Sequence, residues 1–173
     1  KEKKFKNAKK LLESGELKKY EYSDGRYCIV SPGSIKDIYE EGIVLKHCIH
    51  TCDIYFQRMD IRETYLLFLR RTDKPDVPWY TLEIEPGGNI RQKKSVLNEA
   101  YKDLDDAMPF LKKWQQWVKK NLSAKDKKLA EKSDKARKDG YKQLREEKKL
   151  IWHGRLQGTL LADALENDFM EVV

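Results

Sequence analysis

Long apolar runs are missing from this sequence of 173 residues, and so is a secretory leader. No stretch of 18 apolar residues occurs, which excludes a membrane-spanning helix. The chain opens Lys-Glu-Lys-Lys, without the apolar segment of a signal peptide. Three cysteines, an odd number, favour reduced thiols in a cytoplasmic protein that does not contact a membrane. The abrupt basic start leads us to expect a piece of a longer protein.

Several catalytic signatures are missing as well. The sequence has no glycine-rich phosphate loop, no serine-centred elbow and no pair of carboxylates at catalytic spacing. These absences remove the commonest motif-based assignments of enzymatic activity. The chain has only three histidines, and two of them lie with two of the cysteines between His47 and Cys52. That short segment is therefore the first place to look for chemistry.

Positive charge is abundant but unevenly placed. The net charge is +7, and 38% of the residues are charged. Residues 1–10 carry six Lys and one Glu, a net charge of +5, and residues 125–149 carry eleven basic and six acidic groups, again +5. Basic arms around a neutral middle suit a polyanion, because Lys and Arg contacts to phosphate release counterions. The alternative is a solvated helix of mixed charge. The candidate nucleic-acid-binding residues are Lys3, Lys4, Lys6, Lys9, Lys10, Arg71, Arg91, Lys93 and Lys94.

Alternating apolar and polar residues predict a small antiparallel sheet. Five strands are expected, at 20–22, 26–30, 65–71, 79–85 and 90–96. Asp24-Gly25 supplies the positive φ angles of a tight hairpin turn between the first two. In the fourth strand, Tyr80, Leu82 and Ile84 should share one face, and Thr81, Glu83 and Glu85 the other.

Helical spacing surrounds these strands. Helices are expected at 3–13, from Ser34 to a stop at Gly42, at 47–62, at 104–122, at 125–150 and in the tail after Leu150. The fold class is α+β: about five antiparallel strands packed on two or three helices, with a charged C-terminal helical extension. We expect residues 1–122 to form the core domain. Residues 123–173 should form a charged helix and a tail that packs back on that core.

The histidine and cysteine cluster allows three interpretations. His47, Cys48, His50 and Cys52 are the ligand types of zinc, but four candidates on little more than one helical turn cannot face one point. We therefore expect no bound metal and no cofactor. Cys48 as a nucleophile would need a base, and a sequence neighbour on a helix points about 100° away. The third interpretation is acid–base cleavage of phosphodiesters by His47, with Arg70 or Arg71 and Lys93 stabilising charge on phosphate. Glu83 and Gln92 should pair across strands nearby.

Several segments together resemble the PcfJ-like proteins, which occur on conjugative plasmids and phages of Gram-positive bacteria. The segments that carry the resemblance are 45–49, 53–56, 62–71, 79–83, 90–93 and 110–114, within residues 40–170. His47, Cys48 and Gln92 match the family pattern, whereas His50 and Cys52 depart from it, which favours His47 alone as the functional histidine. The resemblance implies the C-terminal part of a longer protein that works on nucleic acid in a mobile element.

Three functions follow as hypotheses. The first is a nucleic-acid-binding module, for DNA or RNA, that works with other proteins of a plasmid or phage DNA-processing complex. The second is a nuclease or phosphodiesterase with His47, Cys48, Arg70, Glu83 and Gln92 as candidate catalytic residues. The third is an interaction scaffold built on the helix at 125–150. The position of His47, in a cleft or in the core, discriminates best between the first two.

Overall fold

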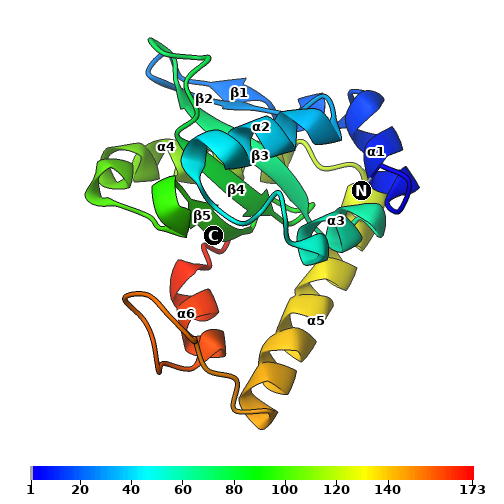
Figure 1. Cartoon of the computed structure of the whole chain (residues 1–173). Helices are drawn as coiled ribbons and strands as arrows, with labels where there is room; N and C mark the ends of the chain where they lie inside the picture. Colours follow the sequence, from blue (N-terminus) through cyan, green and yellow to red (C-terminus); the bar gives the residue numbers. More distant parts are fainter. Residues whose placement is uncertain (1) are drawn as a thin grey trace.

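An antiparallel sheet of five strands forms the centre of the protein (Figure 1). The structure, a computed structural model, describes residues 2–173. The strands pair in sequence order, each with its neighbour, as a meander. They are β1 (Tyr22–Ser23), β2 (Tyr27–Val30), β3 (Tyr65–Arg71), β4 (Tyr80–Ile84) and β5 (Ile90–Lys94). The predicted α+β class and the five-stranded sheet are confirmed, but the strand expected at 20–22 begins only at Tyr22, because Tyr20 ends a 3-10 helix.

Helices cover this sheet and extend beyond it. Within residues 2–173 the α-helices are α1 (Lys6–Glu13), α2 (Ile35–Leu45), α3 (Asp53–Asp60), α4 (Met108–Lys120), α5 (Ala124–Glu146) and α6 (Leu161–Asp168). Short 3-10 helices are η1 (Glu16–Tyr20), η2 (Val96–Asn98) and η3 (Lys102–Ala107). Among these, no helix is long and apolar enough to cross a membrane.

One face of the sheet is apolar and packs against α4. Leu67 of β3 lies opposite Leu82 of β4, and both are fully buried. Alternation carries Tyr80 and Ile84 to the same face, as predicted. From α4, the Trp114 indole fills the space over this face and donates a hydrogen bond of 2.8 Å from Nε1 to the Tyr20 carbonyl. This layer is one part of the hydrophobic core, which also includes Ile38 of α2 and Phe56 and Met59 of α3.

The opposite face of the sheet carries polar side chains beside the buried Leu66 and Phe68, and α2 and α3 cover it (Figure 1). Thr81 and Glu83 of β4 point to this side and are buried. We call the polar groups between the sheet and these helices the polar layer. Its members are Glu41, His47, Arg58, Arg70, Thr81, Glu83 and Gln92. Four of the five catalytic candidates predicted from the sequence, all but Cys48, lie in this layer, out of solvent.

The predicted helix boundaries on either side of His47 are wrong. Gly42 does not stop its helix: α2 continues to Leu45 and ends at Lys46, which adopts a left-handed φ of 53°. A Cβ on Gly42 would lie 2.0 Å from Nδ1 of His50, so glycine is present because an imidazole packs against the helix there. The helix predicted at 47–62 begins only at Asp53, and residues 47–52 form turns.

The C-terminal segments return to the sheet. Helix α5 projects away from the sheet in Figure 1, and α6 leads the chain back. Nη1 of Arg137 in α5 contacts both carboxylate oxygens of Glu85 at 2.6 Å. Met170, after α6, pairs with Ile90 of β5 in an isolated antiparallel bridge. The charged extension therefore has buried anchor points on the sheet edge.

Candidate nucleic-acid interface and polar layer

The basic N-terminal segment is fixed to the protein by the apolar face of α1. Ala8, Leu11 and Leu12 are buried, and the Phe5 ring stacks on Phe56 of α3 with centroids 5.9 Å apart. The Asp60 carboxylate accepts a hydrogen bond of 2.9 Å from the backbone N–H of Ala8, which satisfies a free donor at the helix start. The lysines on the other side of α1 are therefore held on an ordered element.

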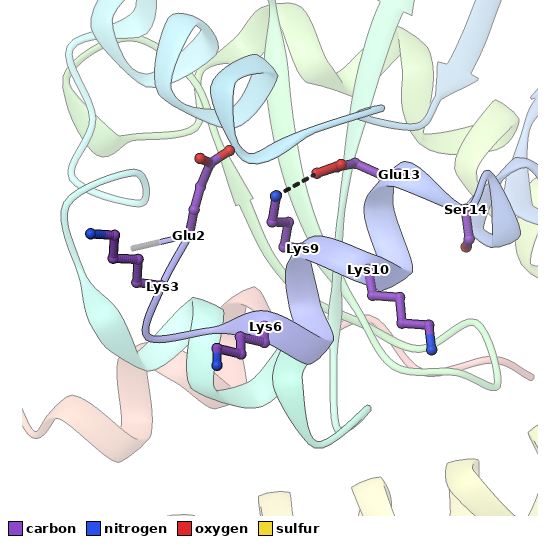
Figure 2. Close-up of a pocket in the computed structure, with 7 residues that line it drawn as sticks. All are labelled: Glu2, Lys3, Lys6, Lys9, Lys10, Glu13 and Ser14. Carbon is purple, nitrogen blue, oxygen red and sulfur yellow. Dashed lines mark ion pairs between the residues drawn. The ribbon is translucent and has the colours of Figure 1, made fainter.

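Four of the five predicted lysines of this segment line an open hollow of about 820 Å³ (Figure 2), and Lys4 is not among the lining residues. Lys3, Lys6 and Lys10 are exposed, and among residues 2–173 none of the three has an ion-pair partner. Lys9 turns toward Glu13 at 3.9 Å, the pair marked in Figure 2. Lys4 binds Asp53 at 2.8 Å. We call these five residues the N-terminal lysine face.

Arg71 lies on a second exposed site at the end of β3. Its guanidinium stacks on the Trp79 ring, 4.1 Å from the centroid, and lies 3.5 Å from an Asp103 carboxylate oxygen. The side chain stays 40% exposed. A stacked guanidinium keeps free edge donors, so Arg71 can still contact phosphate.

The three basic candidates of β5 are engaged within the protein. Arg91 is buried and ion-paired with Glu85 at 2.7 Å and with Glu63 at 2.6 Å. Lys93 is buried against Asp168 of α6 at 3.2 Å, and Lys94 lies 4.0 Å from the same carboxylate. Internal carboxylates thus take the place that phosphate would occupy. Strand β5 is basic in sequence, but its basic side chains bind α5 and α6 to the sheet through hydrogen bonds and ion pairs.

His47 lies in the polar layer, at the sheet surface. Its side chain is 3% exposed, and Nε2 forms a hydrogen bond of 2.9 Å with Oγ1 of Thr81. Within residues 2–173 Nδ1 has no hydrogen-bond partner. Burial lowers the pKa of His47 to about 4, and the charge of nearby His50 acts in the same direction. The imidazole is therefore neutral at neutral pH and is shielded from solvent.

Arg70, expected beside His47, forms a different pair. Its Nη2 lies 2.6 Å from Oε2 of Glu41 in α2, and Nη1 contacts the other oxygen in a bidentate arrangement. Nε donates to the Pro75 carbonyl at 3.2 Å. Both charged side chains are buried. The guanidinium thus ties α2 to β3, and its nitrogens already have partners.

Glu83 and Gln92 come together as the strand register predicted. They are cross-strand partners, and Nε2 of Gln92 donates to Glu83 at 3.0 Å. Glu83 also accepts from Nη1 of Arg58 at 3.0 Å and from the Thr64 hydroxyl at 2.7 Å. The Tyr55 hydroxyl donates to Gln92 at 3.2 Å. This cluster fixes α3 to the sheet by satisfying every group that it buries.

Cys48 is the one exposed member of the predicted catalytic set. Partial burial and the neighbouring Cys52 thiol raise the pKa of Cys48, so it is a thiol rather than a thiolate at neutral pH. Across residues 2–173, no group of three or more His, Cys, Asp or Glu side chains is arranged to hold a metal ion. The segment from His47 to Cys52 does not assemble a four-ligand site.

Sequence reasoning did not single out Glu41, Arg58 or Arg137. These side chains form ion pairs with the buried Arg70, Glu83 and Glu85, in that order. Glu41 lies three residues after Ile38 and four before Leu45, on the buried side of α2. A carboxylate on an otherwise apolar stripe is a signal for a buried cation opposite. Arg137 sits likewise on the thin buried side of α5. The sequence alone does not say which partner each one meets.

Comparison with known proteins gives one match. The model of the family described as PcfJ-like protein matches residues 1–108. This span starts earlier than the expected 40–170 and includes the N-terminal lysine face and the sheet, but not the segments from Pro109 on. No curated protein and no solved structure matches the chain.

Proposed function

Because the chain belongs to the PcfJ-like protein family, the resemblance that the sequence suggested holds, and we propose that it is a nucleic-acid-binding module. We assign it to the DNA-processing complex of a plasmid or phage, with other proteins of that complex as partners. The observation that carries this proposal is the N-terminal lysine face. It lies within the family match, its backbone is anchored by buried side chains, and three of its lysines are unpaired among the described residues.

Electrostatics explain why such a face suits nucleic acid. Exposed ammonium groups on a fixed element attract a phosphate chain without loop-ordering cost, and they release its condensed counterions on contact. Acidic neighbours would weaken this attraction. Of the described residues that line the hollow, Glu2 and Glu13 are acidic, and Glu13 already pairs with Lys9; nearby, Asp53 pairs with Lys4, and Asp60 accepts from the backbone of Ala8. Lysine ammonium groups recognise phosphate as point charges, so this face predicts binding that is independent of base sequence.

The nuclease alternative makes demands that the polar layer does not meet in this conformation. A general base has to reach the proton it removes, directly or through one water. His47 is 3% exposed, and Arg70 is bound to Glu41 rather than available to phosphate. Cleavage by this set would need residues 47–52 to open away from the sheet. The binding module needs no such rearrangement, and we prefer it for that reason.

The test is a titration with labelled DNA and RNA at several salt concentrations. Replacing Lys3, Lys6 and Lys10 by Ala should weaken binding and lower the slope of log affinity against log salt by about 2 to 3, since each phosphate contact contributes somewhat less than one. The matched control replaces Lys36, Lys74 and Lys102, which are also exposed but lie outside the N-terminal lysine face.

The control variant removes the same charge, so it should keep a slope close to that of the unmodified protein. Both triple variants should melt at the normal temperature, because no buried side chain changes. Absence of binding at low salt, or affinity that does not respond to salt, would refute the proposal. Equal losses in the two variants would show that net charge alone, and not this face, governs binding.

A further inference from the structure

The loop between α5 and α6 presents an exposed indole among cations. Trp152 is 83% exposed, whereas Trp79 and Trp114 are buried. From Lys148 to Leu160 the chain carries Lys148, Lys149 and Arg155 and no Asp or Glu. In Figure 1 this orange loop lies at the lower left, at the other end of the molecule from α1. It is a separate basic site outside the family match.

Backbone hydrogen bonds shape this loop into a small hairpin. Leu150 and Leu160 form a bridge, and the N–H groups of Ile151 and Gly158 donate to Thr159 and Ile151 at 3.0 and 2.9 Å. Gly154 turns the chain with a φ of 87°, a left-handed conformation that costs other residues more. Trp152 lies between the bridge and this turn. The indole is thus displayed on an ordered support, which reduces the entropy lost on binding.

We propose that Trp152 stacks on an unpaired base of single-stranded nucleic acid, with Lys149 and Arg155 contacting the flanking phosphates. An exposed indole face stacks on any nucleobase, and cations beside it suit the adjoining backbone. Bases in a duplex are already stacked on each other, so the ligand class is a single strand. This inference rests on the proposed nucleic-acid function and adds the strand class and a second contact site.

The hairpin chemistry favours this ligand over a protein. Three cations without an acidic residue between Lys148 and Leu160 complement a polyanion. Arg155 has one long contact, 3.9 Å to Glu99, with both side chains exposed. An exposed pair of this kind is weak and can exchange for phosphate. Leu150 and Leu156 are also exposed, and these two leucines add apolar surface in the same loop as the indole.

The experiment compares the unmodified protein with a Trp152→Ala variant. Three probes are used: an oligo-dT strand, an abasic strand of equal length, and a blunt duplex. The variant should bind oligo-dT about 5- to 150-fold more weakly, as expected for one lost stack. Its affinities for the abasic strand and the duplex should not change. Trp152→Phe should restore part of the loss, and the melting temperature should stay constant because the side chain is exposed.

The outcomes separate this inference from the proposed function. If oligo-dT and the abasic strand bind alike, and the variant binds both as the unmodified protein does, the stacking site is refuted while charge-driven binding stands. If none of the three probes binds at low salt, both proposals fail. If the variant binds oligo-dT normally but loses self-association in sedimentation, the indole belongs to a protein interface and the inference is wrong.

Discussion

The burial of His47 predicts a specific loss of stability in mild acid. The imidazole has a pKa of about 4 in the folded protein, against an ordinary value of 6.5. Above pH 6.5 neither the folded nor the unfolded state binds the proton. As pH falls from 6.5 to about 4, the unfolded chain binds a proton at His47 that the folded protein does not bind. The unfolded state is therefore favoured. His47 therefore contributes a stability loss confined to this window.

The size of the effect follows from the two pKa values. At about pH 4.5 the proton binds the unfolded chain almost fully and the folded protein only partly, which corresponds to about 2.5 kcal/mol relative to neutral pH. The value needs no large discount for solvent screening, since the side chain is 3% exposed. Carboxylates titrate in the same range, so the total loss in acid also contains their contributions.

A His47→Gln variant isolates the histidine. Glutamine can still form a hydrogen bond with Thr81, but it does not titrate. Urea unfolding at about pH 7.5 and about pH 4.5 gives the free energy of unfolding of both proteins. The unmodified protein should lose about 2.5 kcal/mol more than the variant between these conditions. A constant offset from the substitution cancels in this difference.

An equal loss in both proteins would refute the buried, neutral histidine. That result would place His47 in solvent, as the nuclease hypothesis needs. Cleavage assays on the same pair complete the test. Cleavage of DNA or RNA by the unmodified protein, abolished in the variant, would support the enzyme. If neither protein cleaves nucleic acid, and the unmodified protein shows the predicted larger loss of stability at low pH, the nuclease hypothesis fails and the binding module remains.

The remaining predictions concern stability. Glu41→Gln leaves Arg70 buried without its anion and should cost about 3 to 5 kcal/mol in the free energy of unfolding. The double variant Glu41→Leu with Arg70→Met should recover most of it, and a double variant as unstable as the single would contradict the pairing. Gly42→Ala forces a Cβ onto His50 and should destabilise by about 1 to 3 kcal/mol. Gly140→Ala in α5, where nothing lies within 4 Å, should instead stabilise by about 0.5 to 1 kcal/mol. Equal effects at the two glycines in thermal melts would show that Gly42 has no close neighbour.

The sheet could be predicted from the sequence because its signals are local. Asp24-Gly25 sets the first hairpin, and the period of two along β4 assigns Tyr80, Leu82 and Ile84 to the core. The cross-strand pair of Glu83 and Gln92 follows from the same register. These features depend on residues a few positions apart, and they hold.

The environment of the polar face could not be predicted in the same way. An alternation such as Thr81, Glu83, Glu85 looks the same whether water or a helix lies over it. The difference depends on Arg58 and Arg137, which come from other parts of the chain. The same limit applies to Arg91 and Lys93, whose exposure the sequence suggested and whose partners, Glu85 and Asp168, bury them. A glycine such as Gly42 is equally ambiguous between a helix end and a close contact.

The buried charges also explain how the parts of the chain depend on one another. Glu85 and Arg91 belong to the span that the family model matches, but they have partners in α5. Arg137 forms an ion pair with Glu85, and the Ser133 carbonyl accepts a hydrogen bond from Arg91. Trp114 in α4 covers the apolar face of the same sheet. Without the residues after Met108, Glu85 would lose the cation of α5 and the core would lose its cover. Unpaired buried charges and exposed apolar faces are both costly. The residues after Met108 therefore stabilise the sheet of the matched span, and the basic C-terminal segments both contact this sheet and carry the Trp152 hairpin.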